Sequence, residues 1–114
     1  MNTEPTSGNA ARPVAKTGTL DPARATRVMD NLEKLGMRQV LIADPMSIWY
    51  LTGYWNVPYE RFYGLYLART DEAGAIEATM FCNRLFPDAT STGARVVTFD
   101  DTEDPIPLVS ATVR

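Results

Sequence analysis

Aromatic side chains crowd one short stretch of this chain and lie beside an arginine. Tyr54, Trp55 and Tyr59 fall in the segment from 54 to 61, which has neither helical nor alternating periodicity. Packing gives little reason for such density in an irregular segment, whereas aromatic rings near an arginine are typical of recognition surfaces. Arg61 adds a planar guanidinium that can pair bidentately with a carboxylate. We therefore predict a binding site at these four residues. The alternatives are that the rings fill the core and that Arg61 is an ordinary exposed arginine.

Residue types that do catalytic chemistry are scarce elsewhere. The chain has no histidine, no glycine-rich phosphate loop and no paired-cysteine motif. Cys82 ends an apolar stretch with no histidine to activate it, so we interpret it as a core thiol rather than a nucleophile. Four acidic residues could be imagined as hard oxygen ligands, but they lack the spacing of a calcium loop and are better explained as helix caps and solvated loop charge: Asp100, Asp101, Glu103 and Asp104. We expect no catalytic residue and no bound metal or cofactor in this chain.

The first elements that must position these residues begin at Asp-Pro pairs. Asp21 precedes a proline, which predicts a helix over 21–35, and Gly36 can close it in the left-handed conformation. Asp44 begins the same pattern for a short helix over 45–52 that Gly53 ends, and an apolar strand is predicted between them at 39–43. The buried face of the first helix is predicted to comprise Ala25, Val28, Met29, Leu32 and Leu35.

The second half of the chain predicts strands. Residues 61–69 are apolar on both alternating faces, which indicates a central strand, and 75–82 completes a hairpin with it. Residues 95–99 form another strand, and a helical turn or loop is expected over 83–93. A third Asp-Pro pair at Asp104 predicts another helix start. The fold class is therefore α/β, a mixed β-sheet with flanking helices.

Length and composition limit the class of protein. The 114 residues suffice for one domain, expected over 21–114 after a flexible leader over 1–20. The net charge of −3 with scattered Lys and Arg argues against a nucleic-acid partner. A single cysteine and the lack of a long apolar run favour a cytoplasmic protein with no membrane partner.

Several segments, in their order and spacing, resemble one known family, the creatinase-type N-terminal domain of Xaa-Pro dipeptidases and aminopeptidases P. The resemblance covers about residues 21–109. It is most specific in the run from Asp44-Pro45 to Tyr50-Leu-Thr-Gly53, and it includes four further segments: Met29-Asp-Asn-Leu-Glu-Lys-Leu-Gly36, Glu60-Arg61, Val97-Thr-Phe-Asp100 and Glu103-Asp-Pro105.

The resemblance implies a sheet of ribonuclease-H-like topology, joined in relatives to a pita-bread metallopeptidase domain that we expect to be absent from this chain. In relatives that domain holds two divalent metal ions, usually manganese, and a metal-activated water hydrolyses the bond before proline. None of its metal ligands maps onto this sequence. Family members typically form homodimers in which the N-terminal domain reaches over the partner's active site. In creatinase-like members an aromatic residue and an arginine two residues later help to hold substrate there, and by resemblance the matching positions are Tyr59 and Arg61.

We therefore expect a non-catalytic N-terminal domain of an Xaa-Pro dipeptidase-like or aminopeptidase P-like metallopeptidase. It would contribute to dimerisation and shape the pocket for a proline-containing di- or oligopeptide. One alternative is a stand-alone ligand-binding or interaction module derived from this family. Another is an unrelated small α/β enzyme, which the missing histidine and phosphate loops disfavour.

Overall fold

Both N-terminal Asp-Pro pairs start helices in the computed structural model, which describes residues 19–58, 61–70, 74–85 and 93–113. They are α1 (Pro22–Glu33) and α2 (Pro45–Thr52). A carboxylate oxygen of Asp21 accepts hydrogen bonds from the backbone N–H groups two and three residues on, at 3.0 and 3.1 Å. Asp44 caps α2 in the same way, at 3.3 and 3.2 Å. The side chain at each cap thus satisfies donors that have no partner within the helix.

Glycines follow both helices in the left-handed region, as predicted. Gly53 has φ 73° and closes α2, donating its N–H to the Trp49 carbonyl at 2.7 Å. Gly36 has φ 80°, but α1 already ends at Glu33. The predicted burial of Leu35 is therefore wrong. Its side chain is 71% exposed, because the chain leaves the helix before reaching it.

Four strands form one mixed sheet in the order β1-β2-β3-β4. Neighbours β1 and β2 are antiparallel, as are β2 and β3, whereas β3 and β4 are parallel. The predicted hairpin and the central position of its first strand are both confirmed, because β2 pairs on both edges. The strands are β1 (Gln39–Ile42), β2 (Gly64–Arg69), β3 (Ile76–Asn83) and β4 (Arg95–Phe99).

The first strand of the hairpin begins later than predicted. The backbone N–H of Arg61 donates to the Pro58 carbonyl at 2.9 Å, which makes a turn just before the strand. Pairing with β3 starts only at Gly64. The expectation that Arg61 opens a strand is therefore wrong, and its side chain projects from the connection between α2 and β2.

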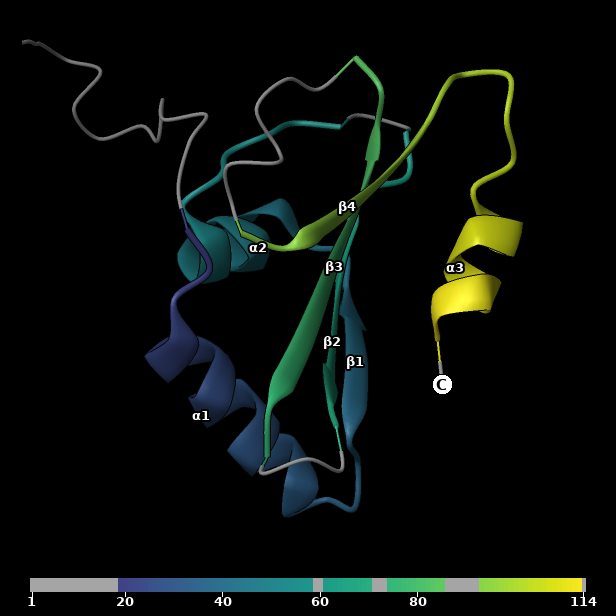
Figure 1. Ribbon diagram of the computed structural model, residues 1–114. Coiled ribbons are helices and arrows are strands. Elements are labelled where there is room, and N and C mark those ends of the chain that lie inside the picture. The colour runs from purple at the N-terminus through teal and green to yellow at the C-terminus, as the bar shows by residue number, and fades with distance from the viewer. Residues whose placement is uncertain (1–18, 59–60, 71–73, 86–92, 114) are drawn as a thin grey trace, which may run out of the picture.

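The two faces of the sheet carry separate cores, as Figure 1 shows with α1 and α2 on one side and α3 (Ile106–Thr112) on the other. Alternating side chains of β2 divide between the two cores as predicted: Leu65 and Leu67 face the first core, as does Tyr63 just before the strand, and Tyr66 and Ala68 face the second. The larger core is covered by α1 and α2 and includes Met29, Ile48 and Met80. The smaller core lies under α3 and includes Phe81 and Phe99.

The third Asp-Pro pair also precedes a helix, but in a different way. An oxygen of Asp104 accepts from the backbone N–H of Ile106 at 3.0 Å, and Pro105 takes the N-cap position. The proline therefore sits one residue earlier relative to the helix than it does in α1 and α2. Most of the predicted helical turn or loop over 83–93, and most of the predicted leader over 1–20, lie outside the described residues.

Candidate functional site

The predicted aromatic site does not form a single surface in the described part of the chain. Tyr54 is only 1% exposed and packs in the larger core, so it offers a ligand almost no surface. Trp55 is half-buried and meets Trp49 edge to face, with ring centroids 6.4 Å apart. Tyr59 lies outside the described residues. Trp49 is also half-buried.

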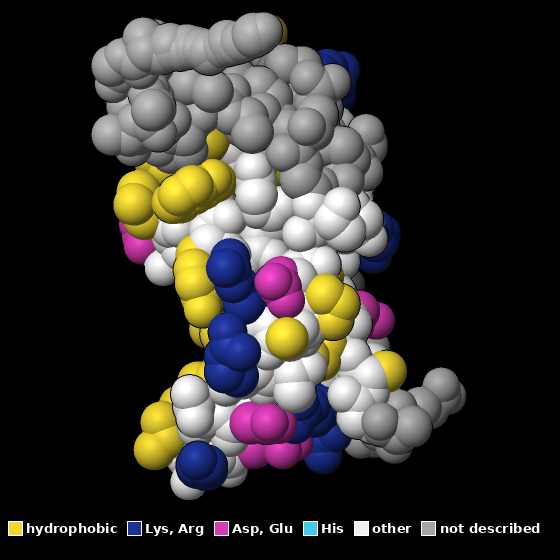
Figure 2. Space-filling view, turned by 90° about the vertical axis from the view of Figure 1, so that its left-hand side faces the viewer, with side chains coloured by type: hydrophobic (Ala, Val, Ile, Leu, Met, Phe, Trp, Pro, Cys, Tyr) yellow, Lys and Arg dark blue, Asp and Glu magenta, His cyan; other side chains and the backbone are white. Residues whose placement is uncertain are grey.

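Figure 2 views the α1 and α2 side, where hydrophobic side chains gather toward the upper end and charges of both signs mix below. The large exposed hydrophobic residues that belong to α2 and the connection after it are Met46, Tyr50 and Val57. Arg24 of α1 lies 4.2 Å from the Tyr50 ring centroid and donates to the Tyr50 carbonyl at 2.7 Å. These contacts hold α1 against the last turn of α2.

Arg61 meets residues that are far away in the sequence. Its Nε donates to Oδ1 of Asp101 at 2.9 Å, and its Nη2 donates to Oδ2 at 3.2 Å. The amide of Asn83, at the end of β3, also donates to Oδ1 of Asp101 at 2.7 Å. We call these three residues the Arg61 cluster. The bonds from Arg61 and Asn83, with the arginine charge, hold the pKa of the Asp101 carboxyl below its ordinary value of 3.8, so the pair stays ionised near neutral pH.

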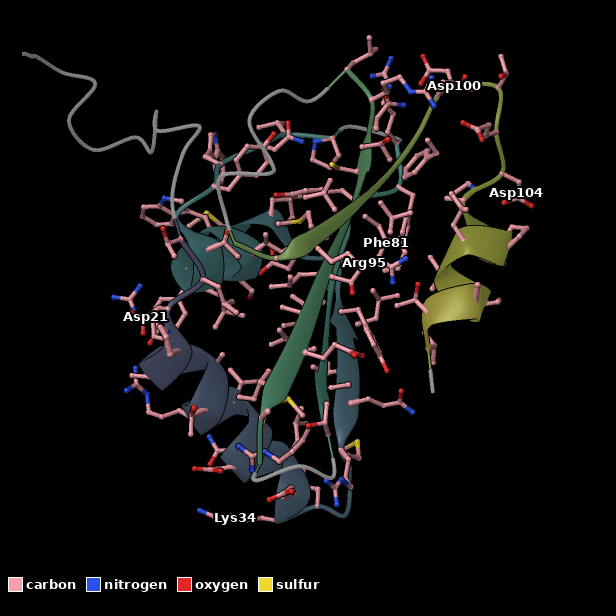
Figure 3. The ribbon with its side chains drawn as sticks, viewed as in Figure 1. Asp21, Lys34, Phe81, Arg95, Asp100 and Asp104 are labelled. Atoms are coloured by element: carbon pink, nitrogen blue, oxygen red, sulfur yellow. The ribbon has the colours of Figure 1, made fainter. Side chains whose placement is uncertain are left out.

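A cavity of about 400 Å³ opens beside the Arg61 cluster. Phe62 and Phe99 supply apolar walls, and Asp100 and Glu103 add carboxylates to that of Asp101. Figure 3 places Asp100 and Asp104 on the connection that leads from β4 to α3, at this end of the sheet. Trp55 and Tyr54 are not among the described residues that line this cavity. The described residues that line the cavity offer a small ligand the Arg61 guanidinium, a rim of carboxylates and the rings of Phe62 and Phe99.

The acidic residues of this connection have local partners, in agreement with their interpretation as caps and loop charge. Asp100 accepts from the hydroxyl of Thr102 at 2.6 Å and from its backbone N–H at 3.0 Å, and these bonds lower the pKa of its carboxyl. Glu103 accepts from the backbone N–H of Asp100 at 2.9 Å and lies 3.5 Å from Arg84. Among the described residues, no group of acids, cysteines and histidines is arranged to hold a metal ion.

Cys82 is a fully buried thiol in the larger core, as predicted. Burial disfavours the charged thiolate and raises its pKa to about 11. The side chain therefore packs as a small apolar group and is not an activated nucleophile.

Sequence reasoning missed the partnership between Arg61 and Asp101. The two residues are 40 positions apart, and each was assigned to a different local pattern. The available signal was topological. The C-terminal ends of β3 and β4 lie at the same end of the sheet because the two strands are parallel. Arg61 precedes β2, which pairs antiparallel with β3 and therefore starts at that end.

Comparison with solved structures identifies the fold of this chain. No family model matches the sequence, and no curated protein is significantly similar to it. A solved X-Pro dipeptidase N-terminal domain from Streptococcus pyogenes, described as a creatinase/prolidase N-terminal domain, is 24% identical with a TM-score of 0.66. The match covers 82% of this chain and 69% of that one. This chain has the creatinase/prolidase N-terminal domain fold.

Two further structures share this creatinase/prolidase N-terminal fold. A proline dipeptidase from Streptococcus pneumoniae is 24% identical with a TM-score of 0.68, over 80% of this chain and 65% of that chain. A prolidase from Thermococcus sibiricus is 23% identical with a TM-score of 0.68, over 83% of this chain but only 25% of that chain. The match thus spans about two thirds of the streptococcal chains and a quarter of the Thermococcus prolidase. Within the described residues, no helix is both long and apolar enough to cross a bilayer.

Proposed function

We propose that this chain is the non-catalytic N-terminal domain of an Xaa-Pro dipeptidase-like or aminopeptidase P-like metallopeptidase. The observation that carries the proposal is the fold shared with prolidase N-terminal domains over about four fifths of the chain. In this proposal a catalytic domain of the same polypeptide holds two divalent metal ions, manganese by resemblance. The present domain contributes to dimerisation and shapes the pocket for a proline-containing peptide.

Arg61 is the proposed substrate contact, together with Tyr59 and Trp55 on the same connection. The Arg61 guanidinium borders the cavity beside β3 and β4, where it can meet the C-terminal carboxylate of a dipeptide. Its side chain is 34% exposed, which leaves it accessible to a ligand. Tyr54 is also one of the four residues of the predicted binding site, but because it is buried it can only support the connection by packing in the core.

The test is a chimaera in which this chain replaces the matched quarter of the Thermococcus sibiricus prolidase. We expect the chimaera with Mn²⁺ to hydrolyse Gly-Pro, and the isolated chain not to hydrolyse it. Arg61→Ala should raise KM roughly tenfold, about 1.4 kcal/mol, with a smaller fall in kcat, because a charge-assisted hydrogen bond to the bound substrate is lost. Arg95→Ala is the matched control, since it removes an exposed arginine at the start of β4. A folded chimaera with unchanged kinetics for Arg61→Ala would contradict the substrate role.

Dimerisation is tested separately. Sedimentation velocity of the chimaera should give a dimer. Mixing an Arg61→Ala subunit with a subunit whose metal site has been disabled should restore part of the activity if the arginine acts across the dimer. A loss of kcat/KM without restoration in the mixture would keep the role but place it within one subunit.

The cavity beside Arg61 favours one second candidate, a stand-alone module that binds a small carboxylate. Isothermal titration of the isolated chain distinguishes the two. Binding of Gly-Gly as tightly as Gly-Pro would favour the module, because a general carboxylate site has no need of the proline ring.

A further inference from the structure

The Arg61 cluster joins three segments of the chain at one end of the sheet. Arg61 comes from the turn before β2, Asn83 is the last residue of β3, and Asp101 lies on the connection from β4 to α3. Arginine has one of the largest side-chain entropies, and a turn position does not by itself fix the direction of the side chain. The contacts that hold Arg61 therefore decide where its charge points.

Asn83 is the anchored end of this arrangement. Its side chain is only 1% exposed. Its carbonyl oxygen accepts from the backbone N–H of Leu85 at 2.9 Å, and its amide nitrogen donates to Asp101 at 2.7 Å. Both ends of the amide are thus engaged in one orientation, which fixes the position of the oxygen that Asp101 presents.

Asp101 in turn fixes the orientation of Arg61. The two oxygens of the Asp101 carboxylate accept hydrogen bonds from Nε and Nη2 of Arg61, along one side of the planar guanidinium. A bidentate pair sets the plane of the guanidinium as well as its distance. A guanidinium carries five N–H donors in a fixed plane, and the pair with Asp101 uses those of Nε and Nη2.

We propose that Asp101 and Asn83 are positioning residues that hold the Arg61 guanidinium ready for the carboxylate of a proline-containing peptide. This inference rests on the proposed substrate role of Arg61. The opposite arrangement is one in which Asp101 competes with the ligand for Arg61. The two arrangements predict opposite changes in ligand affinity. Removing the charge of Asp101 weakens ligand binding if Asp101 orients Arg61 and strengthens it if Asp101 competes.

The experiment follows the Arg61 side chain in the purified full chain by ¹⁵N NMR. In the wild type we expect a resolved Nε–H resonance that exchanges slowly with water. Asp101→Asn should speed this exchange and shift the resonance, and Asn83→Ser should do so to a smaller extent. Asp104→Asn is the matched control. It removes the same charge from the same connection, keeps a capping oxygen for Ile106 and should leave the resonance unchanged.

The same samples are then titrated with Gly-Pro. We expect Asp101→Asn and Asn83→Ser to bind roughly threefold to tenfold more weakly than wild type, the range expected when one long side chain must be ordered on binding. Asp101→Glu should recover part of the loss, and Asp104→Asn should bind as wild type does. Amide spectra confirm the fold of each variant.

Each other outcome overturns a defined claim. Equal or tighter Gly-Pro binding by Asp101→Asn, with binding lost in Arg61→Ala, would overturn the positioning role and leave the proposed function standing. Unchanged binding by Arg61→Ala, or no binding by wild type, would remove the substrate role in this chain and the positioning role with it.

Discussion

The two faces of the sheet are built differently. The face under α1 and α2 buries a continuous apolar core, and the large residues Met29, Ile48, Leu65 and Leu67 are fully inaccessible there. The face under α3 has a smaller core, and the polar Arg61 cluster and its cavity lie at its edge. The short helix α3 covers this face with side chains that are at most half-buried, Leu108 and Val109.

This difference separates stability from recognition within one small domain. Apolar burial contributes stability in proportion to the area removed from water, and the α1 and α2 face carries most of it. A polar cluster at a sheet edge adds little stability, because exposed ion pairs are weak. It does supply fixed direction and charge, which a binding site requires. Variants and probes of each face test this division.

The thiol of Cys82 tests how tightly the α1 and α2 face is closed. Because the side chain is fully buried and its pKa is raised to about 11, labelling by iodoacetamide at pH 8 should require opening of the core. We expect the rate in buffer to be at least roughly 10³-fold slower than in denaturant, as a stability near the low end of the usual range implies. Mass spectrometry measures the rate. Rapid labelling of the folded chain would show that this face opens easily.

Truncation of matched leucines compares the two faces directly. Leu65→Ala should lower the free energy of unfolding by about 2–5 kcal/mol, because it leaves a cavity in the larger core. Leu108→Ala on α3 should cost roughly 1 kcal/mol, since that side chain is only partly buried. Urea unfolding followed by circular dichroism gives both values.

Leu35→Ala is the control for this pair, because the side chain is 71% exposed, and it should change stability by less than about 0.5 kcal/mol. Equal losses for Leu65→Ala and Leu108→Ala would erase the distinction between the faces.

Helix caps extend the comparison. Asp21→Ala should cost about 1 kcal/mol, because two backbone donors at the start of α1 lose their acceptor. Asp21→Asn keeps an acceptor and should recover most of the loss. Asp104→Ala should cost less, since only one donor depends on that side chain and α3 packs loosely. Thermal unfolding compares the three variants, and a larger loss for Asp104→Ala than for Asp21→Ala would contradict this order.

The smallest effect concerns acid stability of the Arg61 cluster. Folding lowers the pKa of Asp101 below 3.8, so the folded state binds its proton less readily than the unfolded chain does. The stability that the ionised carboxylate contributes is therefore present above the unfolded value and is lost as pH falls through the folded pKa. The difference in unfolding free energy between wild type and Asp101→Asn should be constant above about pH 5 and shrink below pH 4. A difference in unfolding free energy that grows on acidification would contradict the ion pair between Arg61 and Asp101.

The elements were predictable where local chemistry is strong. Asp-Pro caps predicted the starts of α1 and α2, Gly53 predicted the end of α2, and the two-sided apolar pattern of 61–69 identified the central strand. The burial of Leu35 was misjudged because periodicity alone does not show where a helix ends. The start of β2 was misjudged because a turn at Pro58 keeps Arg61 out of the ladder.

The site was only partly predictable. Arg61 was predicted as a binding residue from its neighbours in the sequence, but its partners come from strand ends that only the tertiary fold brings together. Tyr54 shows the reverse error, since an aromatic residue in an irregular segment can still face inward and fill the core. The local sequence shows that these side chains lie in an irregular connection, but it does not show whether each one points into the core or toward solvent. The substrate roles of Arg61, Tyr59, Trp55 and Tyr54 remain predictions.

The edge-to-face contact of Trp49 with Trp55 has a spectroscopic consequence. These are the only two tryptophans of the chain, and their rings lie 6.4 Å apart at the junction of α2 with the connection to β2. Intrinsic tryptophan fluorescence therefore reports the opening of this one corner, whereas far-ultraviolet dichroism reports the whole fold. Coincident denaturation curves from the two signals would mean that the corner and the sheet unfold as one cooperative unit.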